Sequence, residues 1–174
     1  MTLAVIGLGN VLLGDDGFGP FVIELLRARY EFPQEVELLD LGTPGLGLVT
    51  YLHGHDAVVL VDVVAGAGAP GDVRIYEGDE LTSMGACARV SPHDPAVAEA
   101  LSIVRAAGSG PRDACLVSTV PGTQELGAAL SEPVRAAAEV AVEIVRRRVE
   151  GCGFDVHCRP ASRVEPDWWR GPYR

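Results

Sequence analysis

Two aspartates and one histidine in this sequence are of the types that hold divalent metal ions or act in acid–base catalysis. Asp16 follows the first apolar run and a glycine-rich turn, Asp62 lies at the end of the most apolar run, and His93 lies where a helix is expected to begin. Two carboxylates and an imidazole form a facial ligand set that leaves coordination positions open for water or substrate. Taken singly, each residue also has a structural interpretation, as a helix cap, a strand-end turn residue or a surface histidine.

The turn that contains Asp16 has a restrictive pattern of glycines and acids. Residues 7–19 read Gly-x-Gly-Asn-x-Leu-x-x-Asp-Asp-Gly-x-Gly. A short Gly-x-Gly match recurs by chance, whereas this longer pattern does not. The adjacent carboxylates of Asp15 and Asp16 raise the cost of placing a phosphate group here. The pattern therefore indicates a loop suited to a cation or a proton.

The elements that must position these residues alternate along the chain. Strands are predicted over 3–7, 36–41, 57–64, 72–77 and 114–120, and helices over 17–30, 44–54, 91–104 and 131–149. This alternation predicts the α/β class, as a three-layer α/β/α sandwich with a mixed, mostly parallel sheet of about five strands. If the strands before Asp16 and Asp62 are parallel neighbours, both carboxylates meet at the carboxyl edge of the sheet, where loops can bring His93 alongside.

Several local features refine this prediction. The run 57–64 is apolar on both faces and should lie centrally, whereas the link before 72–77 is too short for a helical crossover. The strand 72–77 should therefore return antiparallel, at an edge of the sheet. Thr43 is expected to cap a short helix with Pro44 at its first position, and 78–90 is expected to be a loop.

Composition limits the classes of function. The 174 residues carry a formal charge of −10, with 14 basic residues that are all arginine. This balance argues against nucleic acid or an anionic membrane as partner. We find neither a signal peptide nor an apolar run long enough to cross a membrane, so a cytoplasmic location is expected. The segment 1–150 is expected to form one domain, followed by an irregular tail over 151–174.

The remaining histidines and cysteines carry weaker signals. His53 and His55 lie where a short helix ends, which suits a positive side chain. Cys115 lies in an apolar run and is expected to be a small buried hydrophobe. Three tail residues could bind a metal but would form an incomplete structural site: Cys152, His157 and Cys158.

The glycine-rich motif, together with Asp62 in Leu-Val-Asp-Val and His93 in Ser-Pro-His-Asp, resembles the hydrogenase maturation endopeptidases. The stretch Asp40-Leu-Gly-Thr-Pro-Gly-Leu and the start of the last helix, Leu130-Ser-Glu-Pro-Val, also agree with that family. The resemblance spans about residues 3–149. It departs at 120–126, where the family often has a Gln-Pro-Glu run and this chain reads Val-Pro-Gly-Thr-Gln-Glu-Leu.

The resemblance implies an endopeptidase that removes the C-terminal extension of a nickel-loaded hydrogenase large-subunit precursor. It implies that Asp16, Asp62 and His93 are both the catalytic and the metal-contacting residues, with Asp15 capping a helix or ordering its loop. The nickel would come with the precursor, and no organic cofactor is expected. Whether water is activated by the metal or by a carboxylate acting as general base is left open.

Three other interpretations account for parts of the sequence. A non-catalytic chaperone that checks the precursor for nickel would use the same ligands as the enzyme. A nucleotide-binding α/β domain would need a third glycine where Leu12 stands, and its phosphates would face the two aspartates. A peptidyl-tRNA hydrolase opens with a similar glycine turn but needs an early histidine and a basic surface, whereas the first histidine here is His53.

Overall fold

The computed structural model describes residues 1–83 and 97–160. Within them the main sheet has five strands in the order β3-β1-β4-β6-β5. The strands are β1 (Leu3–Leu8), β3 (Val36–Gly42), β4 (Ala57–Val63), β5 (Val73–Glu77) and β6 (Asp113–Thr119). All neighbours pair in parallel except β5, which pairs antiparallel to β6 at the edge of the sheet. The predicted mixed sheet, the central run and the returning edge strand are confirmed.

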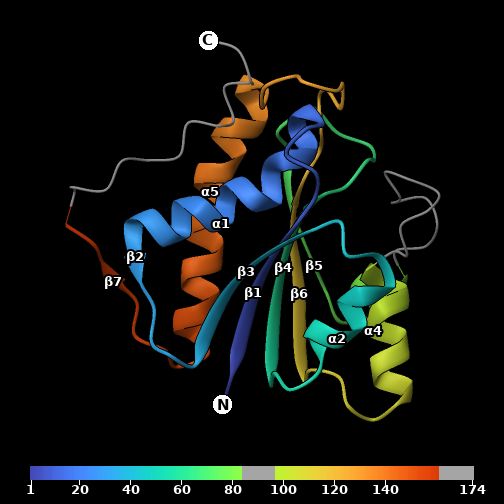
Figure 1. Cartoon of the computed structure of the whole chain (residues 1–174), viewed down its shortest axis with the longest axis vertical. Coiled ribbons are helices and arrows are strands. Elements are labelled where there is room, and N and C mark those ends of the chain that lie inside the picture. Colours follow the sequence, from blue (N-terminus) through green and yellow to red (C-terminus); the bar gives the residue numbers. More distant parts are fainter. Residues whose placement is uncertain (84–96, 161–174) are drawn as a thin grey trace.

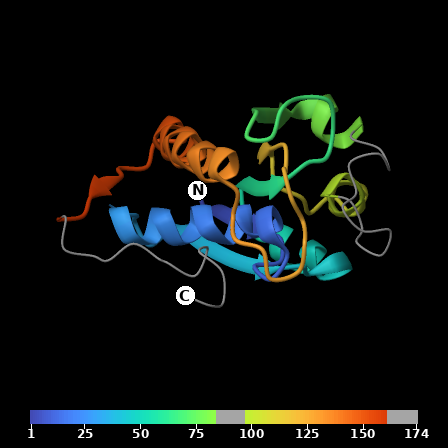
Figure 2. The ribbon, with the colours of Figure 1, turned by 90° about the horizontal axis from the view of Figure 1, so that it is seen from above.

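Helices cover both faces of the sheet, as Figures 1 and 2 show. One face packs against α1 (Phe18–Arg29) and α5 (Glu132–Gly151). The other packs against α2 (Leu48–Leu52), α3 (Gly78–Ser83) and α4 (Val97–Ala106). The fold is therefore the predicted three-layer sandwich. Among the described residues, no helix is both long enough and apolar enough to cross a membrane.

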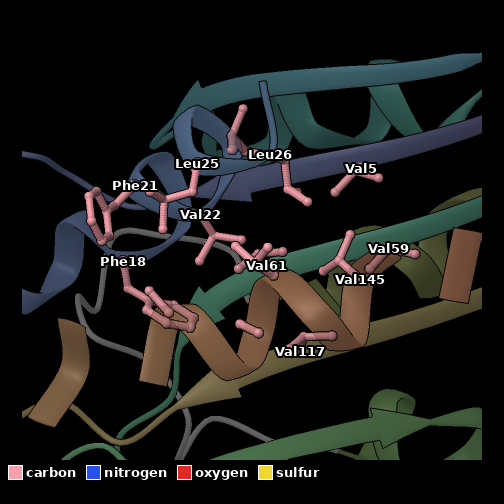
Figure 3. Packing of buried hydrophobic residues seen from close by; sticks show 14 of the residues in the cluster. Val5, Phe18, Phe21, Val22, Leu25, Leu26, Val59, Val61, Val117 and Val145 are labelled. Carbon is pink, nitrogen blue, oxygen red and sulfur yellow. The ribbon is translucent and has the colours of Figure 1, made fainter. Parts of the chain in front are cut away.

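Two apolar cores form because side chains alternate across the central strands. Val59 and Val61 of β4 face α1 and α5, while Val58 and Leu60 face the opposite layer. Figure 3 shows the first of these cores, where side chains of α1, β4 and α5 fill the space between helices and sheet. The predicted last helix buries one apolar stripe along its length, at Val134, Ala138, Ala141, Val142, Val145 and Val149.

The connection after β3 differs from the prediction. Thr43 is not an N-cap; Pro44 precedes a 3-10 turn, η2 (Gly45–Gly47), and the helix begins only at Leu48. The cause is Gly45, whose φ of +56° interrupts a right-handed helix starting at Pro44.

The segment predicted as a loop from residue 78 begins instead with the short helix α3. Its one described buried apolar side chain is Leu81, so the sequence shows no helical periodicity there. The expected beginning of the helix predicted over 91–104 lies outside the described residues, and the described part of that helix begins at Val97.

Part of the expected irregular tail packs on the domain. Tyr30–Glu31 forms β2, which pairs antiparallel with β7 (His157–Cys158). Phe154 and Val156 lie partly buried against the core beside α1 and α5. A two-residue strand leaves no pattern in a sequence, so this pairing could not be foreseen. The division at residue 150 stays a prediction.

Candidate active site at the carboxyl edge of the sheet

Asp16 and Asp62 are brought to one edge of the sheet by the pairing of β1 with β4. These strands are parallel, with Gly7 opposite Val61. Asp62 lies one residue beyond Val61 in β4, and Asp16 lies in the 3-10 turn η1 (Gly14–Gly17), which follows β1 and contacts β4. The structure therefore confirms that the elements carrying Asp16 and Asp62 meet at the carboxyl edge of the sheet.

Two glycines allow the turn after β1 to fold closely against the strand ends. A Cβ on Gly19 would lie 2.2 Å from the carbonyl oxygen of Leu8 and 2.5 Å from that of Val61. Gly9 has a φ of +125°, and its Cβ would lie 1.9 Å from the carbonyl oxygen of Asp16. Because Gly19 lacks a Cβ, the beginning of α1 packs closely on β1 and β4. Because Gly9 lacks one, the backbone of Asp16 packs closely on Gly9.

The Asp16 carboxylate is held in a defined orientation. Its side chain is buried, with 5% of the residue exposed. The backbone N–H of Asn10 donates to Oδ2 at 2.7 Å, and the amide of Gln124 lies 3.5 Å from Oδ1. The first contact is a short hydrogen bond from a fixed donor, whereas the second is at the long limit of hydrogen bonding. The Asn10 contact therefore holds Oδ2 more firmly than the Gln124 contact holds Oδ1.

Asp15 has a different role from Asp16. It is fully buried, and its carboxylate accepts hydrogen bonds from the backbone N–H groups of Gly122, Thr123 and Ser131, at 2.7, 2.9 and 2.6 Å. The hydroxyl of Ser131 also donates to it, at 2.9 Å. No side chain caps α1, whose N-cap is Gly17. Of the two expected roles, loop ordering is therefore correct and helix capping is not.

Asp62 faces the layer formed by α2, α3 and α4. Its neighbours Val61 and Val63 point into the core beside α1 and α5, so the alternation along β4 turns Asp62 the other way. The residue is half-buried and is paired in register with Ser118 of β6. Its Oδ1 accepts the backbone N–H of Val63 at 2.8 Å.

His93 lies outside the described residues, so its place beside the two carboxylates stays a prediction. The described chain resumes at Val97 in α4, which covers the face toward which Asp62 points. Within residues 1–83 and 97–160, no group of three potential ligands is arranged to hold a metal ion.

Two of the other candidates, His55 and Cys115, agree with their structural interpretations. His55 Nδ1 lies 3.2 Å from the carbonyl oxygen of Tyr51 in α2, as expected for a histidine at a helix end. Cys115 is buried, and burial raises the pKa of its thiol to about 12. At neutral pH this thiol is therefore protonated and behaves as a small hydrophobe.

Sequence reasoning missed Gln124 as a neighbour of Asp16. It lies in the loop 120–131, which the Asp15 carboxylate fastens beside η1. Figure 2 shows this loop in orange beside the turn that follows β1. The two segments are more than 100 residues apart, and their contact depends on a buried carboxylate. The only signal was the departure of residues 120–126 from the family pattern.

Comparison with known proteins decides the family. The family model described as HycI, hydrogenase maturation protease, matches residues 20–148. The chain belongs to the hydrogenase maturation protease family. It is accordingly a hydrolase, an endopeptidase. The matched range includes Asp62 and His93 and begins just after the glycine-rich motif with Asp16.

Individual members of the hydrogenase maturation protease family are similar over most of the chain. Hydrogenase expression/formation protein HupM of Azotobacter chroococcum is 36% identical over 144 residues, which cover 82% of this chain and 69% of that protein. The hydrogenase 2 maturation protease of Escherichia coli is 33% identical over 162 residues, which cover 92% of this chain and 98% of that protein. The structure of the hydrogenase maturating endopeptidase HybD from E. coli matches with a TM-score of 0.85 at 32% identity, covering 91% of this chain and 98% of that one.

Proposed function

We propose that this protease removes a C-terminal extension from a hydrogenase large-subunit precursor that already carries nickel. The observation that supports it most is the placement of Asp16 and Asp62 at one edge of the sheet, on strands that pair in parallel. A relative named hydrogenase 2 maturation protease supports the choice of client.

The nickel is part of the substrate in this proposal, and the chain's own residues contact it. Asp16 is presented by a rigid turn, and Asp62 lies at a strand end, half-buried and facing the layer of α4. Carboxylate oxygens and an imidazole nitrogen suit a divalent transition metal. With His93 as the third donor, the set contains no thiolate and is not closed by a fourth protein ligand. Such a set binds a free ion weakly and binds firmly only when the precursor's own ligands complete the coordination sphere.

The reaction is hydrolysis of one peptide bond. Water adds to the scissile carbonyl carbon, the carbon–nitrogen bond breaks, and the products are a new carboxylate and a new amine. Nickel held between precursor and protease would polarise that carbonyl or activate the water. A carboxylate of the protease acting as general base is the other route to the same products.

The experiment compares nickel-loaded with nickel-free precursor by mass spectrometry of the product. The proposal predicts that only loaded precursor loses its extension, that the purified protease is largely metal-free, and that His93→Ala leaves loaded precursor uncut. Equal cleavage of nickel-free precursor, or one tightly held metal ion per purified chain, would contradict it. Binding of loaded precursor with no change in its mass would indicate a chaperone instead.

A further inference from the structure

Four exposed apolar side chains lie on loops at the edge of the sheet that carries Asp16 and Asp62. The exposed fractions are 45% for Val11, 59% for Leu12, 62% for Leu46 and 79% for Leu126. We call these four residues the apolar rim. Val11 and Leu12 follow β1, Leu46 follows β3 and Leu126 follows β6, and these three strands are parallel, so all four residues lie on loops at the carboxyl edge.

The rim is held in place by hydrogen bonds of the loops that carry it. The backbone N–H of Gly127 donates to the carbonyl oxygen of Leu12 at 2.8 Å, which brings Leu126 beside Leu12. The N–H of Leu12 donates to the side-chain oxygen of Asn10 at 3.0 Å. Exposed apolar side chains that gather on loops bonded to each other, as Leu12 and Leu126 do, indicate a surface for contact with a partner, whereas singly scattered ones do not.

The loops that carry Val11, Leu12 and Leu126 also carry two hydrogen-bonding neighbours of the Asp16 carboxylate. Asn10, which contacts Asp16 Oδ2, lies next to Val11, and Gln124, which contacts Oδ1, lies two residues before Leu126. A chain whose scissile bond lies at Asp16 can therefore reach the rim on one side of that bond. Continuity with the site distinguishes these side chains from apolar residues exposed elsewhere, such as Ile103 on α4 and Val140 on α5.

The described loop segments at this edge are mainly acidic, although the side chain of Arg74 in β5 donates to the carbonyl oxygen of Ala67 in the loop 62–72. The segments 8–18, 40–47, 62–72 and 120–131 contain six acidic residues and no lysine, arginine or histidine. The acidic residues are Asp15, Asp16, Asp40, Asp62, Asp72 and Glu125. Asp40 and Glu125 are exposed. A bound peptide with basic residues would complement this charge, and an acidic peptide would be repelled.

We propose that the apolar rim binds the part of the precursor that lies beyond the scissile bond, away from the nickel, as an extended apolar segment that also carries basic residues. This inference rests on the proposed function, because it takes the precursor as the client. An endopeptidase must hold its substrate on both sides of the bond it cuts. Asp16 and Asp62 hold the nickel side, and the rim holds the other.

The first test separates binding from chemistry with the cognate nickel-loaded precursor. The double variant Leu12→Ser/Leu126→Ser is expected to raise KM about tenfold with kcat unchanged, because the lost contacts lie outside the reacting atoms. The control Ile103→Ser/Val140→Ser changes two exposed apolar side chains on other surfaces and should leave both constants unchanged. All four residues are exposed, so equal melting temperatures of the variants and wild type would show intact folding. An unchanged KM in the rim variant would overturn the inference.

The second test uses no nickel and no cleavage, so its failure is distinct from failure of the proposed function. The probe is a fluorescein-labelled 12-residue peptide with alternating leucines and two arginines, and binding is followed by fluorescence anisotropy. Wild type is expected to bind it at least tenfold more tightly than the same peptide with glutamates in place of arginines, and the rim variant is expected to lose this binding. Equal affinity for both peptides, or for wild type and the rim variant, would overturn the inference even if loaded precursor is cut.

Discussion

The carboxylate of Asp15 binds Ser131 at two points, across 115 intervening residues. The backbone N–H of Ser131 donates to Oδ1 at 2.6 Å, and its hydroxyl donates to Oδ2 at 2.9 Å. Ser131 is also the N-cap of α5, although its side chain makes no capping bond because it is turned to Asp15. One buried acid therefore joins the turn before α1 to the beginning of α5 and fixes the loop that carries Gln124.

Replacing this acid should cost stability. In Asp15→Asn an amide NH₂ takes the place of one carboxylate oxygen, so at least one buried donor loses its acceptor. We expect the free energy of unfolding to fall by about 3 kcal/mol, measured by urea denaturation. Ser131→Ala removes only the hydroxyl and should cost about 1 kcal/mol. Equal and small losses in both variants would show that the carboxylate does not hold the loop.

Asp16→Asn should abolish processing of loaded precursor while leaving the fold intact. The asparagine retains an oxygen that can accept the Asn10 N–H, but a neutral amide is a poorer metal ligand. Gln124→Ala, which removes only the long contact to Oδ1, should reduce the cleavage rate about tenfold. Product mass reports the first variant and initial rates report the second. Full processing by Asp16→Asn would exclude Asp16 as a ligand.

Replacing two different glycines by alanine should have different effects on stability. Gly19→Ala places a Cβ against the carbonyl oxygens of Leu8 and Val61, both of which are backbone atoms of the sheet. It should destabilise the fold by about 3 kcal/mol or more, or prevent soluble expression. Gly151→Ala, at the end of α5, meets no atom within 4 Å and should be neutral or stabilise by about 0.5 kcal/mol. Thermal unfolding of both variants measures the difference.

The elements that could be predicted from the sequence are those whose burial is visible in their own pattern of apolar residues. The central strand and α5 show their burial in runs and stripes of apolar residues, and the structure keeps both within a few residues of the predicted bounds. Asp16 and Asp62 could be placed at one edge because parallel strands align their carboxyl ends.

Other features depend on contacts between distant residues, which one sequence does not display. Asp15 resembles any helix-capping aspartate until Gly122, Thr123 and Ser131 converge on it. The strand pair β2–β7 has two residues on each side, too few for a recognisable alternation. The role of Gln124 follows from the folding of its loop onto η1, not from its own residue type.

The packing of β7 predicts that the tail contributes to stability. A chain ending at Glu150 would lose the partly buried side chains of Cys152, Phe154 and Val156, and also the hydrogen bond from the Arg159 side chain to the carbonyl oxygen of Tyr30. We expect the shortened chain to keep its sheet but to melt several degrees lower. Phe154→Ala in the full chain should account for about 1–2 kcal/mol of the loss. An unchanged melting temperature after truncation would show that these contacts contribute nothing.

Burial of Cys115 predicts a specific loss of stability at alkaline pH. Burial raises the pKa of its thiol from 9.0 to about 12. Between these values the unfolded chain releases the thiol proton and the folded chain keeps it, so the unfolded state binds fewer protons and stability falls as the pH rises. By pH 10.5 this loss should reach about 2 kcal/mol. Cys115→Ala lacks the titrating group, so its stability should decline less steeply than that of wild type in urea denaturation at pH 8, 9.5 and 10.5. Parallel declines for the two proteins would show that the thiol ionises equally in the folded and unfolded chains.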